Sequence, residues 1–185
     1  RLIQFTLDVT PPVIQVTGVV NGQVSALPLT PFFTATDAHL AQVSATLDGA
    51  PWPSSTPVTK EGPHLLLVSA SDVVGNTSVA SLSFTLDFTA PTITISGVVE
   101  GASGPSFTPV VSVTDASAVT TSLILDGAPF SSGTTVSSAG AHVLDVVAQD
   151  AAGNLATATV HFVVVAVGGQ CIDLSLLARR TYSPS

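Results

Sequence analysis

Charged residues are scarce in this chain, and basic residues are the scarcest. Charged residues make up 9% of the 185 residues, with 12 acids against four bases and a formal net charge of −8; an ordinary globular domain has about a quarter. A surface so poor in Lys and Arg cannot neutralise phosphates, which predicts that the chain has no nucleic-acid partner. Adsorption to anionic lipid headgroups is disfavoured for the same reason.

The chain also lacks a long apolar run and a second cysteine. Its mean hydropathy is +0.58, but the longest apolar run, from Phe162 to Val167, has the length of a strand. No membrane insertion is therefore expected. Cys171 has no partner for an internal disulfide, which leaves the redox compartment undetermined. With hydrophobic residues at 45%, the chain is expected to fold.

What the chain does contain is a repeat. Three segments recur 78 or 79 positions later: 5–8 at 84–87, 47–51 at 125–129, and 72–76 at 150–154. This period predicts two whole modules, at 9–87 and 88–167. Residues 1–8 match the end of a preceding repeat, so the chain is expected to be a piece of a longer protein. Residues 168–185 form a tail of different sequence.

Apolar residues alternate within each repeat. Five positions in each share one face of a predicted strand: His64, Leu66, Val68, Ala70 and Asp72, matched by His142, Leu144, Val146, Ala148 and Asp150. Period-two alternation predicts half-buried strands, and Gly, Pro, Asn and Asp clusters separate them about every ten residues. The pattern predicts an all-β protein with roughly seven strands per repeat. We expect two tandem immunoglobulin-like, antiparallel Greek-key β-sandwiches in a rod-like arrangement.

The order of motifs resembles the bacterial immunoglobulin-like repeats of surface and secreted proteins, including adhesins. These motifs are Asp-x-Thr-x-Pro, Leu-Asp-Gly-x-Pro, and Gly-x-His-x-Leu-x-Val-x-Ala-x-Asp-x-x-Gly-Asn, and the resemblance covers about residues 1–167. It departs from the pattern after Val165, where the next Asp-x-Thr-x-Pro is absent. The resemblance implies a structural spacer or stalk, located outside the cell or on the bacterial surface. Its implied partners are other protein chains of a surface or filament assembly.

Two other functions remain open. The modules could be adhesive, binding a protein or a glycan through loops or a sheet face, or they could be accessory modules of a larger secreted enzyme. No nucleophile elbow, zinc-spaced His pair or Cys-x-x-Cys is present. We therefore expect no catalytic residue and no cofactor in these modules.

The recurring Asp-x-x-Gly-Asn segments are interpreted as hairpin turns. Asp72, Gly75 and Asn76, and their counterparts Asp150, Gly153 and Asn154, are turn residues, and both glycines are expected to have positive φ. Calcium is the alternative interpretation, and its candidate ligands are Asp8 and Asp87 beside the module boundaries. Because the acids are scattered along the sequence, calcium is predicted not to be required for folding.

Other residues are candidates for structural roles or for partner contacts. His64 and His142 recur at one position, which favours a scaffold role at the rim of the sandwich over catalysis. Trp52 and Phe130 are expected to pack over the sandwich edge, the alternative being contact with a partner. In the tail, five residues are candidate contacts with another chain: Ile172, Leu174 and Leu176, which alternate as one more strand, and Arg179 and Arg180, which would face an acidic surface. The tail folding back on the second module is the other possibility.

Overall fold

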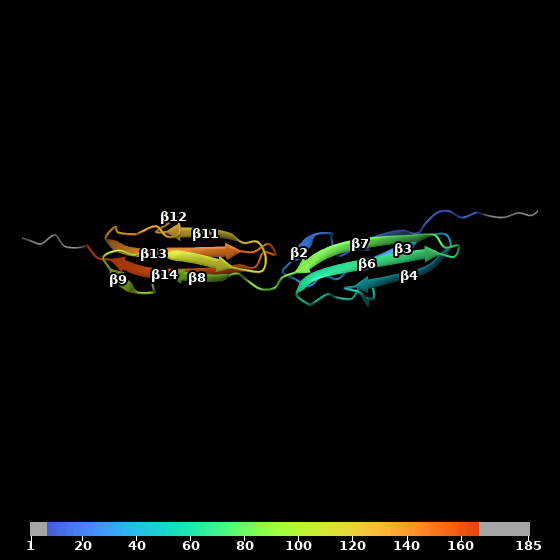
Figure 1. The fold of residues 1–185 in the computed structure, drawn as a ribbon, viewed down its shortest axis with the longest axis horizontal. Helices are drawn as coiled ribbons and strands as arrows, with labels where there is room; N and C mark the ends of the chain where they lie inside the picture. Colours follow the sequence, from blue (N-terminus) through green and yellow to red (C-terminus); the bar gives the residue numbers. More distant parts are fainter. Residues whose placement is uncertain (1–6, 167–185) are drawn as a thin grey trace, which may run out of the picture. The chain divides into compact units, whose positions relative to one another are not determined.

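The computed structural model describes residues 7–166, and every regular element among these residues is a β-strand. Fourteen strands alternate with turns, seven in each sequence repeat (Figure 1). The expected all-β class is thereby confirmed. No helix in the described part of the chain could cross a lipid bilayer. By their internal contacts the residues form two compact units, one of residues up to Thr92 with Thr114–Thr120 and Ala148–Ala156, and one of the remainder.

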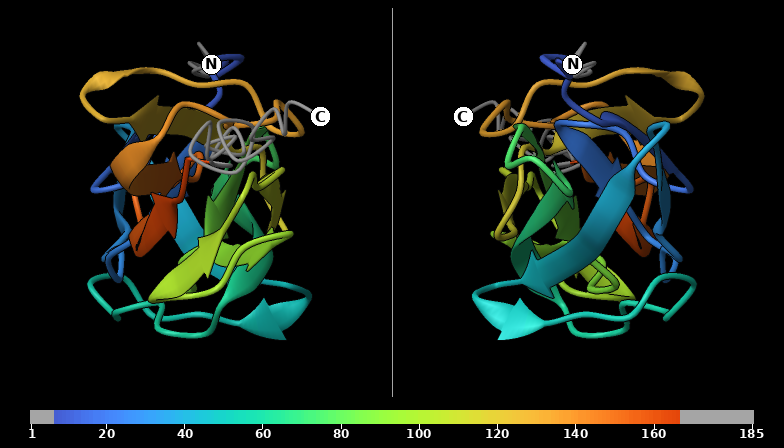
Figure 2. Two further views of the ribbon diagram at one scale, coloured as in Figure 1. Left: turned by 90° about the vertical axis from the view of Figure 1, so that its left-hand side faces the viewer. Right: turned by 90° about the vertical axis from the view of Figure 1, so that its right-hand side faces the viewer.

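The first module, as we use the term, consists of strands β1 to β7. Their bounds are β1 (Val13–Thr17), β2 (Gln23–Ser25), β3 (Phe32–Thr36), β4 (Leu40–Leu47), β5 (Ala50–Pro51), β6 (Gly62–Asp72) and β7 (Thr77–Leu86). One sheet is the antiparallel pair β1–β3, and the other has the order β2-β7-β6-β4-β5. The short strand β5 lies at an edge of the larger sheet and is drawn in cyan in the right-hand view of Figure 2.

The second module consists of strands β8 to β14 and repeats this plan. Their bounds are β8 (Thr92–Ser96), β9 (Ala102–Gly104), β10 (Val110–Thr114), β11 (Thr120–Leu125), β12 (Ala128–Pro129), β13 (Gly140–Gln149) and β14 (Leu155–Val164). The sheets are β10-β8 and β12-β11-β13-β14-β9. Each module therefore has one two-stranded and one five-stranded sheet, which confirms the prediction of two-sheet β-sandwiches.

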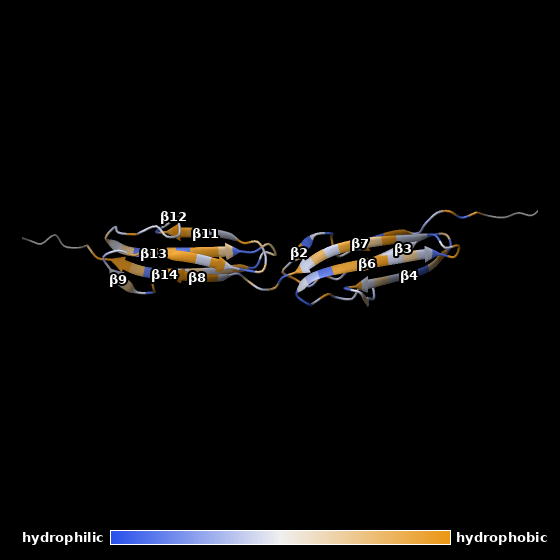
Figure 3. Cartoon of the chain, in the orientation of Figure 1, coloured by the Kyte–Doolittle hydropathy of each residue, from blue (hydrophilic) through white to orange (hydrophobic). Residues whose placement is uncertain are grey.

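The core of each sandwich follows the predicted alternation, which Figure 3 shows as bands along the strands. The five inward positions of β6 are at most 5% exposed, and those of β13, together with Asp150 directly after it, are at most 7% exposed. In the first module, Phe84 and Leu86 of β7 complete the buried layer, and Ile14, Val16 and Phe33 of the small sheet pack against it. Burying these side chains between two sheets supplies the main drive for folding.

One strand pair in each module corrects the expectation of a purely antiparallel sandwich. Strand β2 pairs in parallel with β7, and β9 pairs in parallel with β14. The chain crosses from the small sheet to the large one between β1 and β2, which brings an early strand beside the last strand of the module. Alternation within one strand carries no information on the direction of its neighbour, so the sequence did not predict this pairing.

In each module, a loop serine forms hydrogen bonds with the backbone at one edge of the small sheet. Ser54 Oγ accepts from Phe33 N at 2.9 Å and donates to Phe33 O at 3.2 Å. Ser132 makes the same two contacts with Val111, at 2.8 and 3.3 Å. We call Ser54 and Ser132 the edge serines, because each occupies the backbone groups that another strand would otherwise pair with.

A glycine after the first strand of each module permits a close approach of two backbone segments. Gly18 and Gly97 both have φ of +78°. A Cβ on Gly18 would collide with the carbonyl oxygen of Thr30, and a Cβ on Gly97 with that of Thr108. Glycine is therefore required at both positions by φ and by space.

Candidate functional site

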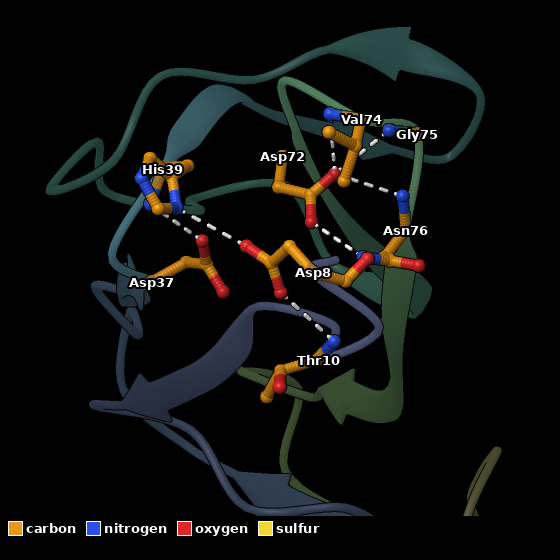
Figure 4. Close-up of polar contacts among 8 residues, drawn as sticks. All are labelled: Asp8, Thr10, Asp37, His39, Asp72, Val74, Gly75 and Asn76. Atoms are coloured by element: carbon orange, nitrogen blue, oxygen red, sulfur yellow. Dashed lines mark hydrogen bonds and ion pairs between the residues drawn. The ribbon is translucent and has the colours of Figure 1, made fainter. Parts of the chain in front are cut away.

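Three potential metal ligands meet at one end of the first module. Asp8, Asp37 and His39 each offer one ligand atom, all within 4.8 Å of one another (Figure 4). Asp8 Oδ2 lies 3.1 Å from His39 Nδ1, and Asp37 Oδ1 accepts from His39 N at 2.7 Å. The loop between β3 and β4 thus brings Asp37 and His39 to the segment that enters the module.

The Asp-x-x-Gly-Asn turn lies beside this cluster and holds the entering segment. Asp72 Oδ1 accepts from the backbone N–H groups of Val74, Gly75 and Asn76 at 2.7–3.0 Å, which closes the turn (Figure 4). Burial alone would raise the pKa of Asp72, but hydrogen bonds, first from the Asn76 side chain at 2.6 Å and then from these backbone groups, hold the pKa below its usual value. Asn76 Nδ2 donates to Asp8 O at 3.3 Å. The turn is therefore also an anchor for the segment before β1.

The glycines of the two turns have the positive φ that the sequence predicted. Gly75 has φ of 98° and Gly153 of 96°. In the second module, Asn154 Nδ2 donates to Asp87 O at 2.8 Å and to Thr89 O at 3.3 Å. The second turn thus anchors residues 87–89 just as the first anchors Asp8.

The corresponding cluster in the second module contains carboxylates alone. Asp87, Asp115 and Asp150 have one oxygen each within 4.8 Å of the others, and Asp87 and Asp150 are buried. Asp115 Oδ1 accepts from Ser117 N and Oγ, both at 2.8 Å, and Asp87 Oδ1 accepts from Thr89 N at 3.3 Å. Burial would raise the pKa of Asp150, but hydrogen bonds, chiefly from Asn154, hold it below its usual value.

These clusters correct one argument from the sequence. The acids are scattered along the chain, yet the fold brings the two candidates Asp8 and Asp87 together with Asp37 and with Asp115, respectively. The oxygen set of the second cluster suits a hard cation such as Ca²⁺, whereas the imidazole in the first suits a transition metal better. Three ligands are fewer than the six to eight oxygens that calcium usually takes. The signal that sequence reasoning missed is that Asp37 and Asp115 recur 78 positions apart, like the other repeated motifs.

A buried histidine in each module links two of the repeated motifs. His64 Nδ1 lies 2.7 Å from Asp48 Oδ2, and its Nε2 lies 2.7 Å from Lys60 O. Asp48 is the first residue of a two-residue turn between β4 and β5, and both Asp48 and Gly49 have positive φ, as a type I′ turn requires. The other carboxylate oxygen of Asp48 accepts from Leu65 N at 2.8 Å. The Leu-Asp-Gly and Gly-x-His motifs are therefore one structural unit.

The second module repeats this unit. His142 Nδ1 lies 2.6 Å from Asp126 Oδ2, and Nε2 lies 2.8 Å from Ser138 O. The hydrogen bond to Asp126, followed by that to Ser138 O, raises the pKa of His142 despite its burial. Burial alone would raise the pKa of Asp126, but hydrogen bonds from His142 and from Val143 N hold it below its usual value.

The two histidines do not have the geometry of a catalytic base. In a Ser-His-Asp site, Nδ1 faces the acid and Nε2 faces the nucleophile. Here Nε2 of each ring faces a backbone carbonyl instead. Neither ring nitrogen is therefore free to accept a proton from a hydroxyl, and the scaffold interpretation of both histidines fits this geometry.

Trp52 and Phe130 both pack against the cores of their modules, as expected for aromatics over a sandwich edge. The indole Nε1 of Trp52 is buried and has no hydrogen-bond partner among the described residues. Beside Trp52 lies a hollow of about 340 Å³, lined by Leu47, Asp48, Ala50, Pro51, Pro57, Val58, Thr59, Lys60 and His64. The five candidate contact residues of the tail, Ile172 to Arg180, and Cys171 lie outside the described residues.

Comparison with known proteins adds little to this picture. No family model and no curated protein matches the chain. Among solved structures, the fibronectin(III)-like modules of Clostridium thermocellum CbhA are 14% identical, with a TM-score of 0.42 over 83% of this chain and 95% of that one. A titin I-band fragment is 12% identical, with a TM-score of 0.46 over 84% of this chain and 66% of its own.

A third similar structure is SGBP-B of the Bacteroides ovatus mixed-linkage glucan utilization locus, in complex with a heptasaccharide. It is 16% identical, with a TM-score of 0.34 over 83% of this chain and 47% of its own length. The chain thus spans about half of that protein. Likenesses this weak carry no argument about function, and the sandwich fold rests on the strand topology described above.

Proposed function

We propose that the two modules are non-catalytic, load-bearing spacers of a longer bacterial protein that is secreted or displayed on the cell surface. The observation that supports the proposal is the parallel pairing of an early strand with the last strand in both modules. On this proposal the partners are other protein chains of the same surface assembly.

The direction of the paired strands decides how they respond to tension. In a parallel pair, the N-terminal end of β2 and the C-terminal end of β7 lie at opposite ends of the ladder. Tension that enters before β2 and leaves after β7 therefore shears the strands and loads their hydrogen bonds together. An antiparallel pair pulled in the same way would open one bond at a time.

Backbone hydrogen bonds close both ends of each parallel ladder. Gly22 N donates to Ser83 O at 2.7 Å, and Asp87 N donates to Ser25 O at 3.0 Å. In the second module, Gly101 N donates to His161 O and Val165 N to Gly104 O, both at 2.8 Å. The same bonds at the same places in both modules indicate a common response to load.

One side chain in each module reinforces the ladder at its start. Asn21 Oδ1 accepts from Ser83 N at 2.8 Å. At the equivalent place, Glu100 Oε2 accepts from His161 N at 2.9 Å. A backbone N–H that would otherwise face solvent is thus bonded across the strands that carry the load.

Single-molecule force spectroscopy tests the proposal. The chain is pulled from its two ends, and separately through thiols introduced at the paired positions Val24 and Thr85, with Cys171→Ser as the background. We expect a clearly higher unfolding force for the first module when it is pulled from the ends, because only that geometry shears β2 against β7. Equal forces in the two geometries would contradict the proposal.

The hollow beside Trp52 favours a second candidate, an adhesive module that binds a glycan or a protein. A lining that contains Trp52, Asp48 and Lys60 suits a ligand that is partly apolar and partly polar. Screening the chain against glycan arrays, with Trp52→Phe as the matched variant, tests this candidate. Binding that Trp52→Phe abolishes would favour adhesion.

A further inference from the structure

The hydrogen-bond partners of the two buried histidines dictate their protonation. A backbone carbonyl oxygen only accepts hydrogen bonds, so the Nε2 atoms of His64 and His142 must each carry a proton. An ionised carboxylate also only accepts, so each Nδ1 must carry a proton as well. With both nitrogens protonated, the ring is an imidazolium cation.

The alternative is a neutral ring that accepts a proton from a protonated carboxyl. The exposure of the aspartates argues against it. The side chains of Asp48 and Asp126 are 46% and 43% exposed, whereas those of His64 and His142 are 3% and 7% exposed. A carboxyl group that reaches water is ionised at any pH above the ordinary pKa of an aspartate. The shared proton therefore belongs to the imidazole ring.

We propose that the second module contains a proton-dependent latch, in which the buried imidazolium of His142 holds the Asp-Gly turn against the following long strand. In its doubly protonated form the ring donates one hydrogen bond to the Asp-Gly turn and one to the loop that precedes the histidine's own strand. Loss of one proton sets a nitrogen lone pair against the carboxylate or against the carbonyl. The latch is then left with a buried unpaired acceptor, which lowers the stability of its module.

Few other charged groups face the latch. Besides His64, Lys60 is the charged side chain that lowers the pKa of Asp48. In the second module the equivalent residue is the uncharged Ser138. Each ring also lies against an aromatic ring, Phe84 in the first module and Phe162 in the second, with ring centroids at 5.3 Å.

The direction of the pH effect follows from the second module. The pKa of His142 is raised on folding, chiefly by Asp126, so the folded module binds this proton more tightly than the unfolded chain. Its contribution to stability is complete below the unfolded value of about 6.5 and is lost as the pH rises through the folded pKa. The pKa of Asp126 is lowered, so its contribution is lost only as the pH falls through that lowered value.

The variant Asp126→Asn separates the latch from ordinary packing. An asparagine tolerates the positive φ of this position, and its Oδ1 still accepts from Val143 N. Its Nδ2 then donates to the Nδ1 of a neutral ring, whose Nε2–H still bonds to Ser138 O. All partners remain satisfied without an imidazolium, so the variant should fold and lose the pH dependence.

The experiment measures urea unfolding of the full chain from about pH 5 to about pH 9, with nitrogen NMR of labelled histidine in parallel. For the second module of the wild type we expect the folding constant to fall about tenfold across this range, the order of one charge-assisted hydrogen bond. The NMR should show His142 protonated at both nitrogens at the acidic end.

Two results would overturn the latch. One is an NMR spectrum of the wild type that shows a neutral His142 ring at the acidic end of the pH range. This result does not depend on whether the variant folds. The other is the same pH dependence in the wild type and in folded Asp126→Asn. The force measurement does not depend on this ring, so the latch and the spacer function can fail separately.

Discussion

At four pairs of equivalent positions the two modules use the same side chain to bond to the backbone, and at several other positions they use different side chains. The shared positions are Asp48 and Asp126, Ser54 and Ser132, Asp72 and Asp150, and Asn76 and Asn154. The positions that differ are Trp52 and Phe130, Lys60 and Ser138, and His39 and Ser117. Replacing a backbone-bonding side chain leaves an N–H or C=O without its partner. The backbone geometry therefore restricts the first group more than the second, although Asn21 and Glu100 show that two different side chains can accept from an equivalent backbone N–H.

The largest expected loss of stability is at a pair of glycines that both modules share. Gly18→Ala and Gly97→Ala should each destabilise their own module by about 3 kcal/mol or more, because a Cβ collides with a backbone carbonyl at a positive φ. Urea unfolding measures the effect. Fluorescence of Trp52, the single tryptophan, reports the first module, and resolved amide signals report the second.

Gly22→Ala is the matched control, since Gly22 has φ of +79° but nothing within 4 Å of its Cβ position. This control should cost about 1 kcal/mol, from backbone strain alone. If Gly18→Ala costs no more than Gly22→Ala, the close approach to Thr30 is wrong.

A smaller and equal effect is expected at the two Asp-x-x-Gly-Asn turns. Gly75→Val and Gly153→Val should each cost about 1 to 2 kcal/mol, because both glycines have positive φ and neither has close neighbours. Thermal and urea unfolding of each variant measure the cost. Unchanged stability in both would show that these glycines do not shape the turns, and unequal losses would break the equivalence of the modules.

Exchanging the aromatic residues tests where the modules differ. Trp52→Phe should change the stability of the first module by less than about 1 kcal/mol, because the loss of apolar contact is offset by removing a buried N–H that has no partner within residues 7–166. The reverse change, Phe130→Trp, should destabilise the second module by about 1 kcal/mol or more, by overpacking. A large loss in Trp52→Phe would mean that the indole N–H has a partner, such as a bound water.

The smallest effect is expected from metal removal. We predict that both modules stay folded in EDTA, because Asp72 and Asp150 already receive several hydrogen bonds from their own turns. Melting temperatures in EDTA and in millimolar calcium measure this. A rise with calcium confined to the second module would show that Asp87, Asp115 and Asp150 bind the ion and that His39 weakens the first cluster.

The sequence predicts those parts of the structure that depend on periodicity. The alternation along β6 and β13 identified the buried faces, including the ends of that pattern at His64 and Asp72. The alternation and the spacing of the turn clusters predicted roughly seven strands per repeat, and the structure has seven in each. The positive φ of Gly75 and Gly153 followed from the local turn chemistry. All of these features depend on residues within one or two strands of each other.

The rest depends on contacts that no local pattern encodes. His64 meets Asp48 across 16 positions, and Ser54 meets Phe33 across 21. Asp8 meets His39 across 31 positions. Periodicity places each of these residues on a strand or a loop, but not beside its partner. The repeat contained an unused clue for one of these pairs, since His64 and Asp48 recur together as His142 and Asp126.

The edge serines have a consequence for how such a chain folds beside copies of itself. Neighbouring modules with related sequences can exchange strands while folding, since a segment of one fits the open sheet edge of the next. Ser54 and Ser132 occupy the backbone groups through which an intruding strand would bond, so an exchange must first displace a contact already made. One hydroxyl per module therefore protects a tandem array against misassembly, and the protection holds for each copy however many times the module is repeated.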